Sequence, residues 1–384
     1  MIKPKNDSRL FREFLILAFF LFVFADAIFG ETENGLTIYD STASFKHYAY
    51  EVDSNTMIKS YDRYDMVDTV FKTKVIENKY LKVNLLPDFG GRILSIIYKP
   101  TGHEQLYQNP LGTPYNIGTG GFYYDWLMVY GGIFPTFPEP EHGKTWCLPW
   151  ETRTTVQTAD RISVEMRFTD TIEPVGKTPK RYDKGRTDIT CIATVSVFKY
   201  APYVALTIKL INNRSKPVDY EYWTCATLAP GSVPGETAAP ANSEIVIPID
   251  RLLIDWGGWM QSVEKRIGGN IFEFERLALY SNWSDMGIAY AHPRVEREWW
   301  GVVNHENEEG IFRIADNARH TPGMKLWTWG WRQGENSSQR FGNSARPYIE
   351  LWAGSSLQFF SSARMAPRLT GGVLAQAKIP VSLK

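Results

Sequence analysis

Beyond its first thirty residues, the chain alternates apolar and polar side chains over many short stretches. The alternation is clearest at residues 80–85, 162–168, 189–197 and 204–210. A period of two is typical of β-strands that bury one face. The same pattern predicts further strands at residues 245–249, 311–314, 348–352 and 373–383. Most of the chain is therefore predicted to form half-buried strands.

Turn-forming residues separate these strands, and no long helical pattern interrupts them. Glycine, proline, asparagine and aspartate gather at residues 86–91 and 212–215, which favours turns. After the first thirty residues, no segment keeps a helical period for more than about two turns. The predicted fold class is all-β, with two large sheets packed face to face.

The chain is predicted to form one domain, because its sequence shows neither a repeat nor an interdomain linker. No fixed-period repeat is visible, which argues against a propeller or a β-helix. Polar stretches at residues 173–186 and 231–243 are expected to be long loops on one domain rather than linkers. We therefore predict a single β-sandwich domain over residues 28–384.

The N-terminus has the pattern of a targeting segment. Four basic side chains lie among residues 3–12, and residues 14–24 form an apolar run of 11 residues. Ala25, Asp26 and Ala27 follow, which suits cleavage by a signal peptidase. Because the run is shorter than the roughly 20 residues that span a bilayer, residues 1–27 are predicted to be a cleaved signal peptide, with an uncleaved anchor as the alternative. The protein is expected to be secreted or periplasmic.

Composition excludes several classes of function. The 384 residues include 42 basic and 42 acidic side chains, so no electrostatic footprint for nucleic acid or for an anionic membrane is present. Three cysteines without a CxxC pair are too few for a disulfide scaffold. The histidines show no HxH or HExxH spacing, and no EF-hand pattern occurs, so neither a metal site nor another cofactor is predicted.

Three segments combine turn chemistry with reactive side chains. In residues 86–93 two glycines turn the chain and deliver Arg92 to the next strand. Residues 131–143 run through a Gly-Gly-Ile-Phe-Pro sequence to a His-Gly pair, and a Pro-Trp-Glu sequence follows shortly after. Residues 347–354 form a predicted strand with one carboxylate, Glu350, among apolar neighbours.

Together these segments resemble the galactose mutarotase-like (aldose 1-epimerase) superfamily. Members have a Gly-Gly-Arg turn between two strands, a Gly-Gly-Ile-Pro-type loop leading to His-Gly and Pro-Trp-Glu, and a glutamate on a late strand. The resemblance covers about residues 75–352. It implies a large twisted antiparallel β-sandwich and chemistry on sugars.

The resemblance assigns roles to three residues, each of which also has a simpler interpretation. His142 would protonate a ring oxygen, since imidazole titrates near neutrality; otherwise it is a solvated loop histidine. Glu350 would be the base in a cleft; otherwise it is an ordinary surface glutamate. Arg92 would bind a sugar hydroxyl or carboxylate; otherwise it pairs with a carboxylate at its own turn. If all three act together, they converge on one concave face.

Tryptophans supply candidate sugar-binding surfaces. Alternation places Trp327, Trp329 and Trp331 on one strand face, where a row of indoles offers a platform for a sugar ring. Lys325 shares their parity and would add a hydroxyl or uronate contact. The remaining candidates for substrate binding are Trp146 and Trp223. Core packing is the ordinary role of a tryptophan, and at least half of those near loops and strand ends are expected to be core.

The chain departs from the family pattern at one position. Mutarotases that open the sugar ring use a second histidine, which is expected in the strand at residues 220–224, yet Tyr222, Trp223 and Thr224 stand there. Glu350 and His142 together would still supply one base and one acid. Alternatively, this branch binds sugars or performs other chemistry on them.

Three functions follow from these observations. The first is a secreted aldose-epimerase-type enzyme acting on a sugar through Glu350 and His142. The second is a polysaccharide lyase in which Arg92 or Lys325 neutralises a uronate and His142 with Tyr222 performs β-elimination. The third is a non-catalytic glycan-binding module. In each case the partner is a mono-, oligo- or polysaccharide, with no nucleic acid and no membrane beyond the signal segment.

Overall fold

A computed structural model describes most of the chain after its N-terminal segment. The described residues are 35–52, 58–109, 111–114, 127–128, 131–138, 142–146, 148–173, 185–257, 266–268, 270–284, 286–295, 297–331, 346–359, 368–369 and 372–380. By its internal contacts the chain divides into Met1–Gly35 and Leu36–Lys384. The predicted signal peptide, residues 1–27, lies outside the described residues.

The larger of two main sheets has 15 strands. Its strands, in spatial order, are β17 (Arg266–Gly268), β18 (Ile271–Glu273), β16 (Arg251–Gly257), β19 (Gly287–His292), β22 (Gly323–Thr328), β23 (Ile349–Gly354), β14 (Trp223–Ser232), β5 (His103–Leu106), β4 (Arg92–Tyr98), β3 (Leu81–Leu86), β2 (Ile58–Glu77), β1 (Thr37–Val52), β6 (Leu111–Pro114) and β7 (Leu127–Met128). Off this path, β8 (Gly132–Thr136) pairs with β14 and β4.

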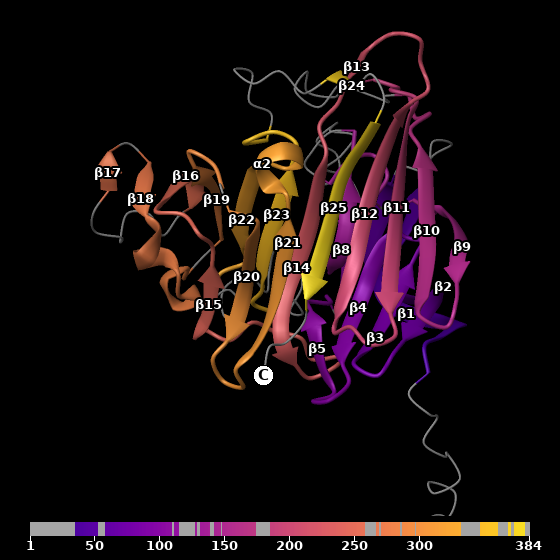
Figure 1. The fold of residues 1–384 in the computed structure, drawn as a ribbon, viewed down its shortest axis with the longest axis horizontal. Helices are drawn as coiled ribbons and strands as arrows, with labels where there is room; N and C mark the ends of the chain where they lie inside the picture. Colours follow the sequence, from indigo (N-terminus) through magenta and orange to yellow (C-terminus); the bar gives the residue numbers. More distant parts are fainter. Residues whose placement is uncertain are drawn as a thin grey trace, which may run out of the picture. The chain divides into compact units, whose positions relative to one another are not determined.

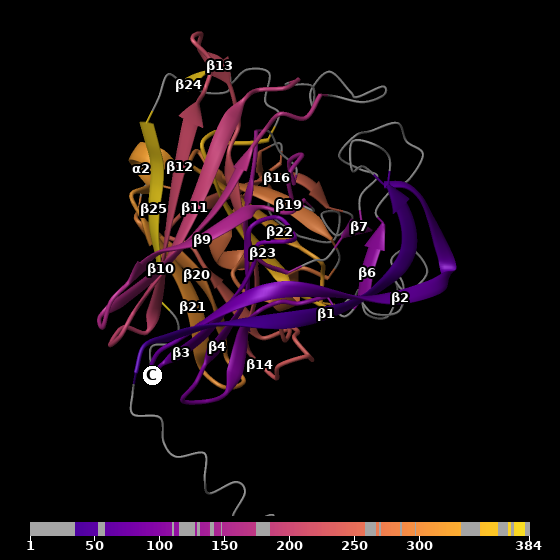
Figure 2. The same ribbon diagram turned by 90° about the vertical axis from the view of Figure 1, so that its right-hand side faces the viewer.

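The second sheet has eight strands and lies against the first. Its order is β15 (Ser243–Val246), β20 (Trp299–Asn304), β21 (Glu309–Ala315), β25 (Gly372–Pro380), β12 (Tyr203–Asn212), β11 (Ile189–Phe198), β10 (Arg161–Thr169) and β9 (Glu151–Gln157). A small third sheet joins β13 (Val218–Asp219) to β24 (Arg368–Leu369). Figures 1 and 2 show the two large sheets as two layers.

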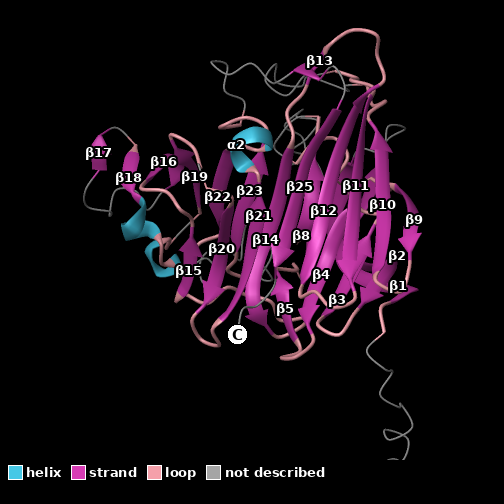
Figure 3. Ribbon diagram, in the orientation of Figure 1, coloured by secondary structure: helices cyan, strands magenta, loops and turns pink. Residues whose placement is uncertain are grey.

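Helix is confined to short pieces in the described part of the chain (Figure 3). These are the one-turn helix α2 (Asn317–His320) and the 3₁₀ turns η3 (Phe274–Leu277) and η4 (Tyr280–Asn282). Among the described strand pairs, only β1 with β6 is parallel. The predicted all-β antiparallel sandwich is confirmed, and each of the eight predicted strands has a counterpart. The clearest are β10, β11 and β12, whose burial alternates as expected.

The long β1–β2 hairpin was not predicted. Its strands pair over 16 and 20 residues, and Figure 2 shows it extending past the other strands, with β6 and β7 beside its far end. Side chains such as Tyr64 and Val70 are exposed on it. One face is nonetheless partly buried, where Phe45 and Phe71 pack against a small cluster around Leu86. Because few large apolar residues mark this face, the alternation is weaker than in the predicted strands.

Two apolar clusters lie on opposite faces of the 15-stranded sheet. The interior cluster fills the space between the two sheets and includes Val83, Ile96, Val195 and Leu206. The second cluster is aromatic and lies on the other face; we call it the outer aromatic face. Its buried members are Tyr107, Phe134, Trp146, Trp223, Cys225, Ala229, Tyr290, Trp329, Tyr348 and Trp352. This face contains most of the candidate site.

Candidate functional site

The pairing of residues between neighbouring strands defines the centre of the outer aromatic face. Cys225 of β14 is paired with Phe134 of β8 on one side and with Trp352 of β23 on the other. Trp352 is paired in turn with Lys325 of β22, and Lys325 with Tyr290 of β19. Residues that face each other across neighbouring strands project to the same side of a sheet. Five strands therefore contribute one transverse row of side chains.

Glu350 lies in the next row of the same face. It is paired with Thr227 of β14 and with Trp327 of β22. It lies two positions before Trp352 on the strand, so both side chains project to the same side of β23. The indole Nε1 of Trp352 donates a hydrogen bond of 2.6 Å to Oε2 of Glu350. At 5 % exposure, Glu350 is not the surface glutamate of the simpler interpretation.

Lys325 places a cationic group beside these aromatic rings. Its Nζ lies 4.3 Å from the ring centre of Trp352 and 4.3 Å from that of Phe359. The side chain is fully buried. The face of an aromatic ring attracts a cation, and the attraction strengthens when water is excluded. The rings thus stabilise a positive charge two positions along β22 from Trp327.

Glycines make room for the Trp223 indole in a third row. Trp223 is paired with Gly354, which is itself paired with Gly323. A Cβ atom on Gly354 would lie 2.2 Å from Cδ2 of the indole, and one on Gly323 would lie 2.8 Å from Cη2 of the indole and 1.8 Å from the carbonyl oxygen of Ser356. Since real Cβ contacts are never this short, the buried indole requires glycine at both positions.

His142 reaches the outer aromatic face from the loop after β8. Its ring stacks on Trp146, with ring centres 4.3 Å apart and an interplanar angle of 24°, and lies 5.7 Å from the ring of Trp352. The pKa of His142 falls well below its ordinary value, because burial disfavours the cation and because Lys325 and Arg92 add positive charge nearby. The imidazole is therefore neutral near neutral pH. It suits a base or a neutral hydrogen-bond donor better than a cationic acid.

A buried ion pair fixes this loop. Lys144 Nζ lies 2.9 Å from Oδ2 of Asp170, and both side chains are completely buried. Asp170 also accepts hydrogen bonds from the backbone N–H and the hydroxyl of Thr187. Breaking such a pair from one side leaves an uncompensated buried charge. The position of His142 consequently depends on a carboxylate at the end of β10, which the sequence did not indicate.

Arg92 acts as a positioning residue in the structure. Its guanidinium donates to the backbone carbonyls of Phe89, Gly131 and Trp146, at 2.7, 3.1 and 2.9 Å, and lies 4.6 Å from the ring centre of Phe134. Arg92 is fully buried. It ties the Gly-Gly turn to the segments before β8 and after His142. Its predicted contact with sugar stays a prediction.

Of the predicted tryptophan row, the structure keeps two members. Trp327 and Trp329 lie 5.7 Å apart, and both contact Tyr348. Trp331 instead packs on the interior cluster and donates its indole N–H to the carbonyl oxygen of Ser281. The strand ends at Thr328 and the backbone turns at Gly330, where φ is 87°. Alternation therefore stops before Trp331.

Tyr222 does not join the other predicted site residues. It belongs to the interior cluster, whereas its neighbour Trp223 belongs to the outer aromatic face. Its hydroxyl is hydrogen-bonded to that of Thr224 at 2.8 Å. Burial raises the pKa of Tyr222 well above its ordinary value, and Cys191 adds to this shift. A role as proton donor beside His142 is not compatible with this placement.

Glu221 is a second buried carboxylate that sequence reasoning missed. Its Oε1 accepts hydrogen bonds from Nε1 of Trp223 at 3.0 Å and from the hydroxyl of Ser356. The arrangement repeats that of Glu350 with Trp352, on the neighbouring antiparallel strand. A Glu-x-Trp sequence occurs at both places but also at residues 298–300, so the sequence alone gave only a weak signal. Glu221 lies just before β14, within residues 220–224, where the resemblance expected the second histidine.

Comparisons with known proteins agree with this fold. The model of a family described only as a domain of unknown function (DUF5107) matches residues 42–171, about a third of the chain. A TPR-domain containing protein from Parabacteroides distasonis is similar at a TM-score of 0.67 and 15 % identity; the match covers 91 % of this chain and 55 % of that one. This chain thus spans about half the length of that protein.

Two further structures carry names that indicate sugar chemistry. A candidate aldose 1-epimerase from Klebsiella pneumoniae matches with a TM-score of 0.57 and 12 % identity, over 91 % of this chain and 88 % of that one. A candidate mutarotase (YeaD) from Salmonella typhimurium matches with a TM-score of 0.53 and 12 % identity, over 88 % and 97 %. At such identities the likeness concerns the fold alone. The fold of this chain is that of the galactose mutarotase-like superfamily.

Two negative observations apply to the residues described. No helix in this part of the chain is both long and apolar enough to cross a membrane. Over the same residues, no three or more side chains of His, Cys, Asp or Glu come together as metal ligands would.

Proposed function

We propose that the chain is a carbohydrate-active protein whose outer aromatic face performs aldose-epimerase-type chemistry. The observation that carries the proposal is the gathering of Glu350, His142 and Lys325 around Trp352. Glu350 is hydrogen-bonded to the Trp352 indole, His142 lies 5.7 Å from its ring, and Lys325 lies 4.3 Å above it. A base, an imidazole and a cation beside one apolar ring suit the recognition and turnover of a sugar.

In this proposal Glu350 takes the proton of the anomeric hydroxyl. The bond between the anomeric carbon and the ring oxygen breaks, and the anomeric carbon becomes a carbonyl. The neutral N–H of His142 hydrogen-bonds to the ring oxygen as that oxygen becomes an alkoxide. The oxygen takes up a proton from solvent, while Glu350 releases its own proton to solvent, and the reverse reaction closes the ring on the other face of the carbonyl. A neutral imidazole whose N–H points at an oxygen can act as the electrophile in such a step. Lys325 provides the neighbouring positive charge, and Trp327 the stacking surface.

One observation favours a lyase as the second candidate. β-Elimination of a uronate needs a cation that neutralises the carboxylate and a base that removes the adjacent proton. Lys325 and the neutral His142 match these two requirements. The proton donor of this reaction has to be a group other than Tyr222, since that residue lies in the interior cluster.

The two reactions give different signals. Polarimetry of freshly dissolved α-glucose and α-galactose measures epimerase activity as a faster approach to the equilibrium rotation. Ultraviolet absorbance with uronic-acid polymers measures elimination, because that reaction leaves a conjugated double bond. Acceleration of rotation supports the epimerase, and new absorbance supports the lyase. Glycan binding with neither signal would contradict both and leave a binding module.

We also propose that residues 1–27 direct export to the periplasm or beyond the cell. The support is the basic start, the apolar run and the small residues at 25–27. Sequencing the N-terminus of the mature protein tests this. A new N-terminus close to residue 28 is expected, and an intact residue 1 on exported protein would favour the uncleaved anchor.

A further inference from the structure

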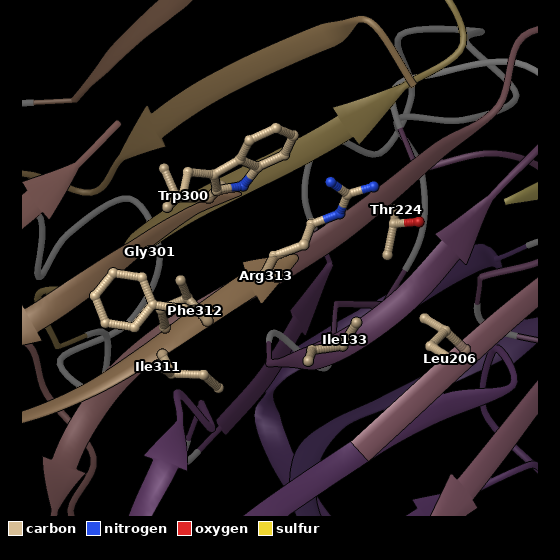
Figure 4. Close-up of a pocket in the computed structure, with 11 residues that line it drawn as sticks. Ile133, Leu206, Thr224, Trp300, Gly301, Ile311, Phe312 and Arg313 are labelled. Atoms are coloured by element: carbon tan, nitrogen blue, oxygen red, sulfur yellow. The ribbon is translucent and has the colours of Figure 1, made fainter. Parts of the chain in front are cut away.

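A small cavity lies between the two sheets, on the side away from the outer aromatic face. Its volume is about 40 Å³. The larger sheet contributes apolar side chains such as Ile133, Ala226 and Leu228, and the smaller sheet contributes Trp300 and Ile311. Figure 4 shows Ile133, Trp300 and Ile311 of these walls. A water needs about 10–15 Å³ of such space, so the cavity has room for a few carbon atoms and no more.

Arg313 is the only charged side chain among the described residues that line this cavity. In Figure 4 it extends from β21 toward the side where Thr224 lies. Its guanidinium lies 4.5 Å from the ring centre of Trp300 and donates hydrogen bonds to Asn317 and, at 2.8 Å, to Thr321. Both acceptors are neutral. Among the described residues, no carboxylate lies within ion-pair distance of Arg313.

Within the described part of the chain, this arrangement leaves a half-buried guanidinium without a negative partner in a mainly apolar setting. Burial lowers the pKa of Arg313 to about 10, and Tyr222 opposes the shift, so the side chain is still a cation at neutral pH. Asn317 and Thr321 use two of the five N–H donors of a guanidinium. A cation that is largely removed from water is normally paired, and the partner that suits the planar guanidinium best is a carboxylate.

We propose that the cavity binds a short aliphatic monocarboxylate. The carboxylate accepts hydrogen bonds from Arg313, and the hydrocarbon tail of a few carbons lies between Ala226, Leu228 and Ile311. The apolar walls disfavour an ion without a hydrocarbon tail, such as phosphate. The Arg313 cation disfavours a ligand that has the tail but no negative charge. This site is separate from the sugar chemistry proposed above and does not rest on it.

The test uses the mature protein and a ligand series of acetate, butanoate and butanamide. Isothermal titration and the midpoint of thermal unfolding report binding, since a ligand that binds the folded state stabilises it. We expect butanoate to bind at least about tenfold more tightly than either butanamide or acetate, because butanamide lacks the charge and acetate lacks most of the tail. Equal affinity for butanoate and butanamide, or no binding of butanoate, would overturn the proposal.

Variants localise the binding. Arg313→Met keeps the length of the side chain without its charge and should weaken butanoate binding at least about tenfold. Ala226→Leu fills the cavity and should abolish the binding, while Arg153→Met, at a residue whose side chain is 70 % exposed, should leave it unchanged. Unaltered binding in both cavity variants would place the ligand elsewhere. If either variant does not fold, nuclear Overhauser effects between butanoate and the Leu228 and Ile311 methyls in the natural chain decide; their absence on saturation with butanoate refutes the site.

Discussion

The indole Nε1 of Trp352 donates a 2.6 Å hydrogen bond to Oε2 of Glu350. Both side chains leave β23 on the same face, so the strand itself fixes the direction of the carboxylate. A base for sugar chemistry is useful only when its orientation is set before the sugar arrives, and the indole provides that orientation.

Replacement of Trp352 by Phe should separate orientation from packing. The ring and most of the apolar contact remain, while the N–H donor to Glu350 is lost. A hydrogen bond to a charged group contributes about 1.5–3 kcal/mol, so kcat should fall by roughly tenfold to a hundredfold. Trp299→Phe, at a residue that is 40 % exposed, is the control and should keep full activity. Unchanged kcat in Trp352→Phe would show that the indole does not orient the base.

The Lys144–Asp170 pair should be far more important for stability than a surface pair. Lys144→Met leaves Asp170 as an isolated buried charge, and the free energy of unfolding should fall by about 3–5 kcal/mol. Arg153→Met breaks the Arg153–Glu165 pair, which is partly exposed, and should cost at most about 1 kcal/mol. Urea unfolding measures both. Equal, small losses in the two variants would mean that the buried pair does not hold the loop of His142.

Gly354→Ala should destabilise the fold through its contact with Trp223. The new methyl group would lie 2.2 Å from the indole, and overpacking of this kind costs about 1–3 kcal/mol. In the Trp223→Ala background the same substitution should cost much less, because the indole no longer fills the space. A double-mutant cycle by thermal unfolding measures the difference, and strict additivity would contradict the proposed contact.

Stability should depend on pH through His142. The folded-state pKa of this residue is lower than that of an unfolded histidine, because burial and then Lys325 and Arg92 disfavour the cation. Below about pH 6.5 the unfolded chain binds a proton that the folded chain does not, so stability falls as the pH decreases through that range. Above it, the contribution is constant.

Urea unfolding between about pH 7.5 and pH 5 measures this effect. His142→Gln should remove part of the loss of stability at the lower pH, whereas His305→Gln, at an exposed histidine, should keep it. Identical pH profiles for the natural chain and His142→Gln would show that the imidazole is not held neutral.

The sequence predicted the strands in which apolar residues mark the buried face. It did not predict segments in which this apolar marking is weak or the strand ends early. The strand β11 was predictable because Cys191, Val195 and their neighbours alternate with polar residues. In the β1–β2 hairpin the inward positions include small or polar residues such as Ala43 and Thr73, so the apolar alternation is weak although burial alternates. Trp331 was misplaced because Gly330 ends the regular period. Tyr222 and Trp223 are adjacent in the sequence, and adjacent residues of an extended chain project to opposite sides. Their assignment to one site on a single face was therefore inconsistent with the predicted strand.

Ion pairs between distant segments of the chain could not be predicted from the sequence, for a different reason. Lys144 and Asp170 lie on different segments, and neither position has a local pattern that points to the other. Only the packing of the His142 loop against the end of β10 brings them together. By contrast, the Glu-x-Trp pattern is local and visible in the sequence. It occurs three times, and at residues 221–223 and 350–352 it forms the same glutamate–indole hydrogen bond.

The proposed function predicts that Glu350 is the group that removes the anomeric proton. The direct measurement is the rate at which the natural chain and Glu350→Gln interconvert the anomers of α-glucose and α-galactose, read by polarimetry. The natural chain should accelerate the interconversion of at least one sugar above the rate in buffer, and Glu350→Gln should lower kcat by roughly 10²–10⁴-fold. A natural chain that accelerates neither sugar, or a Glu350→Gln variant with full activity, would contradict the account.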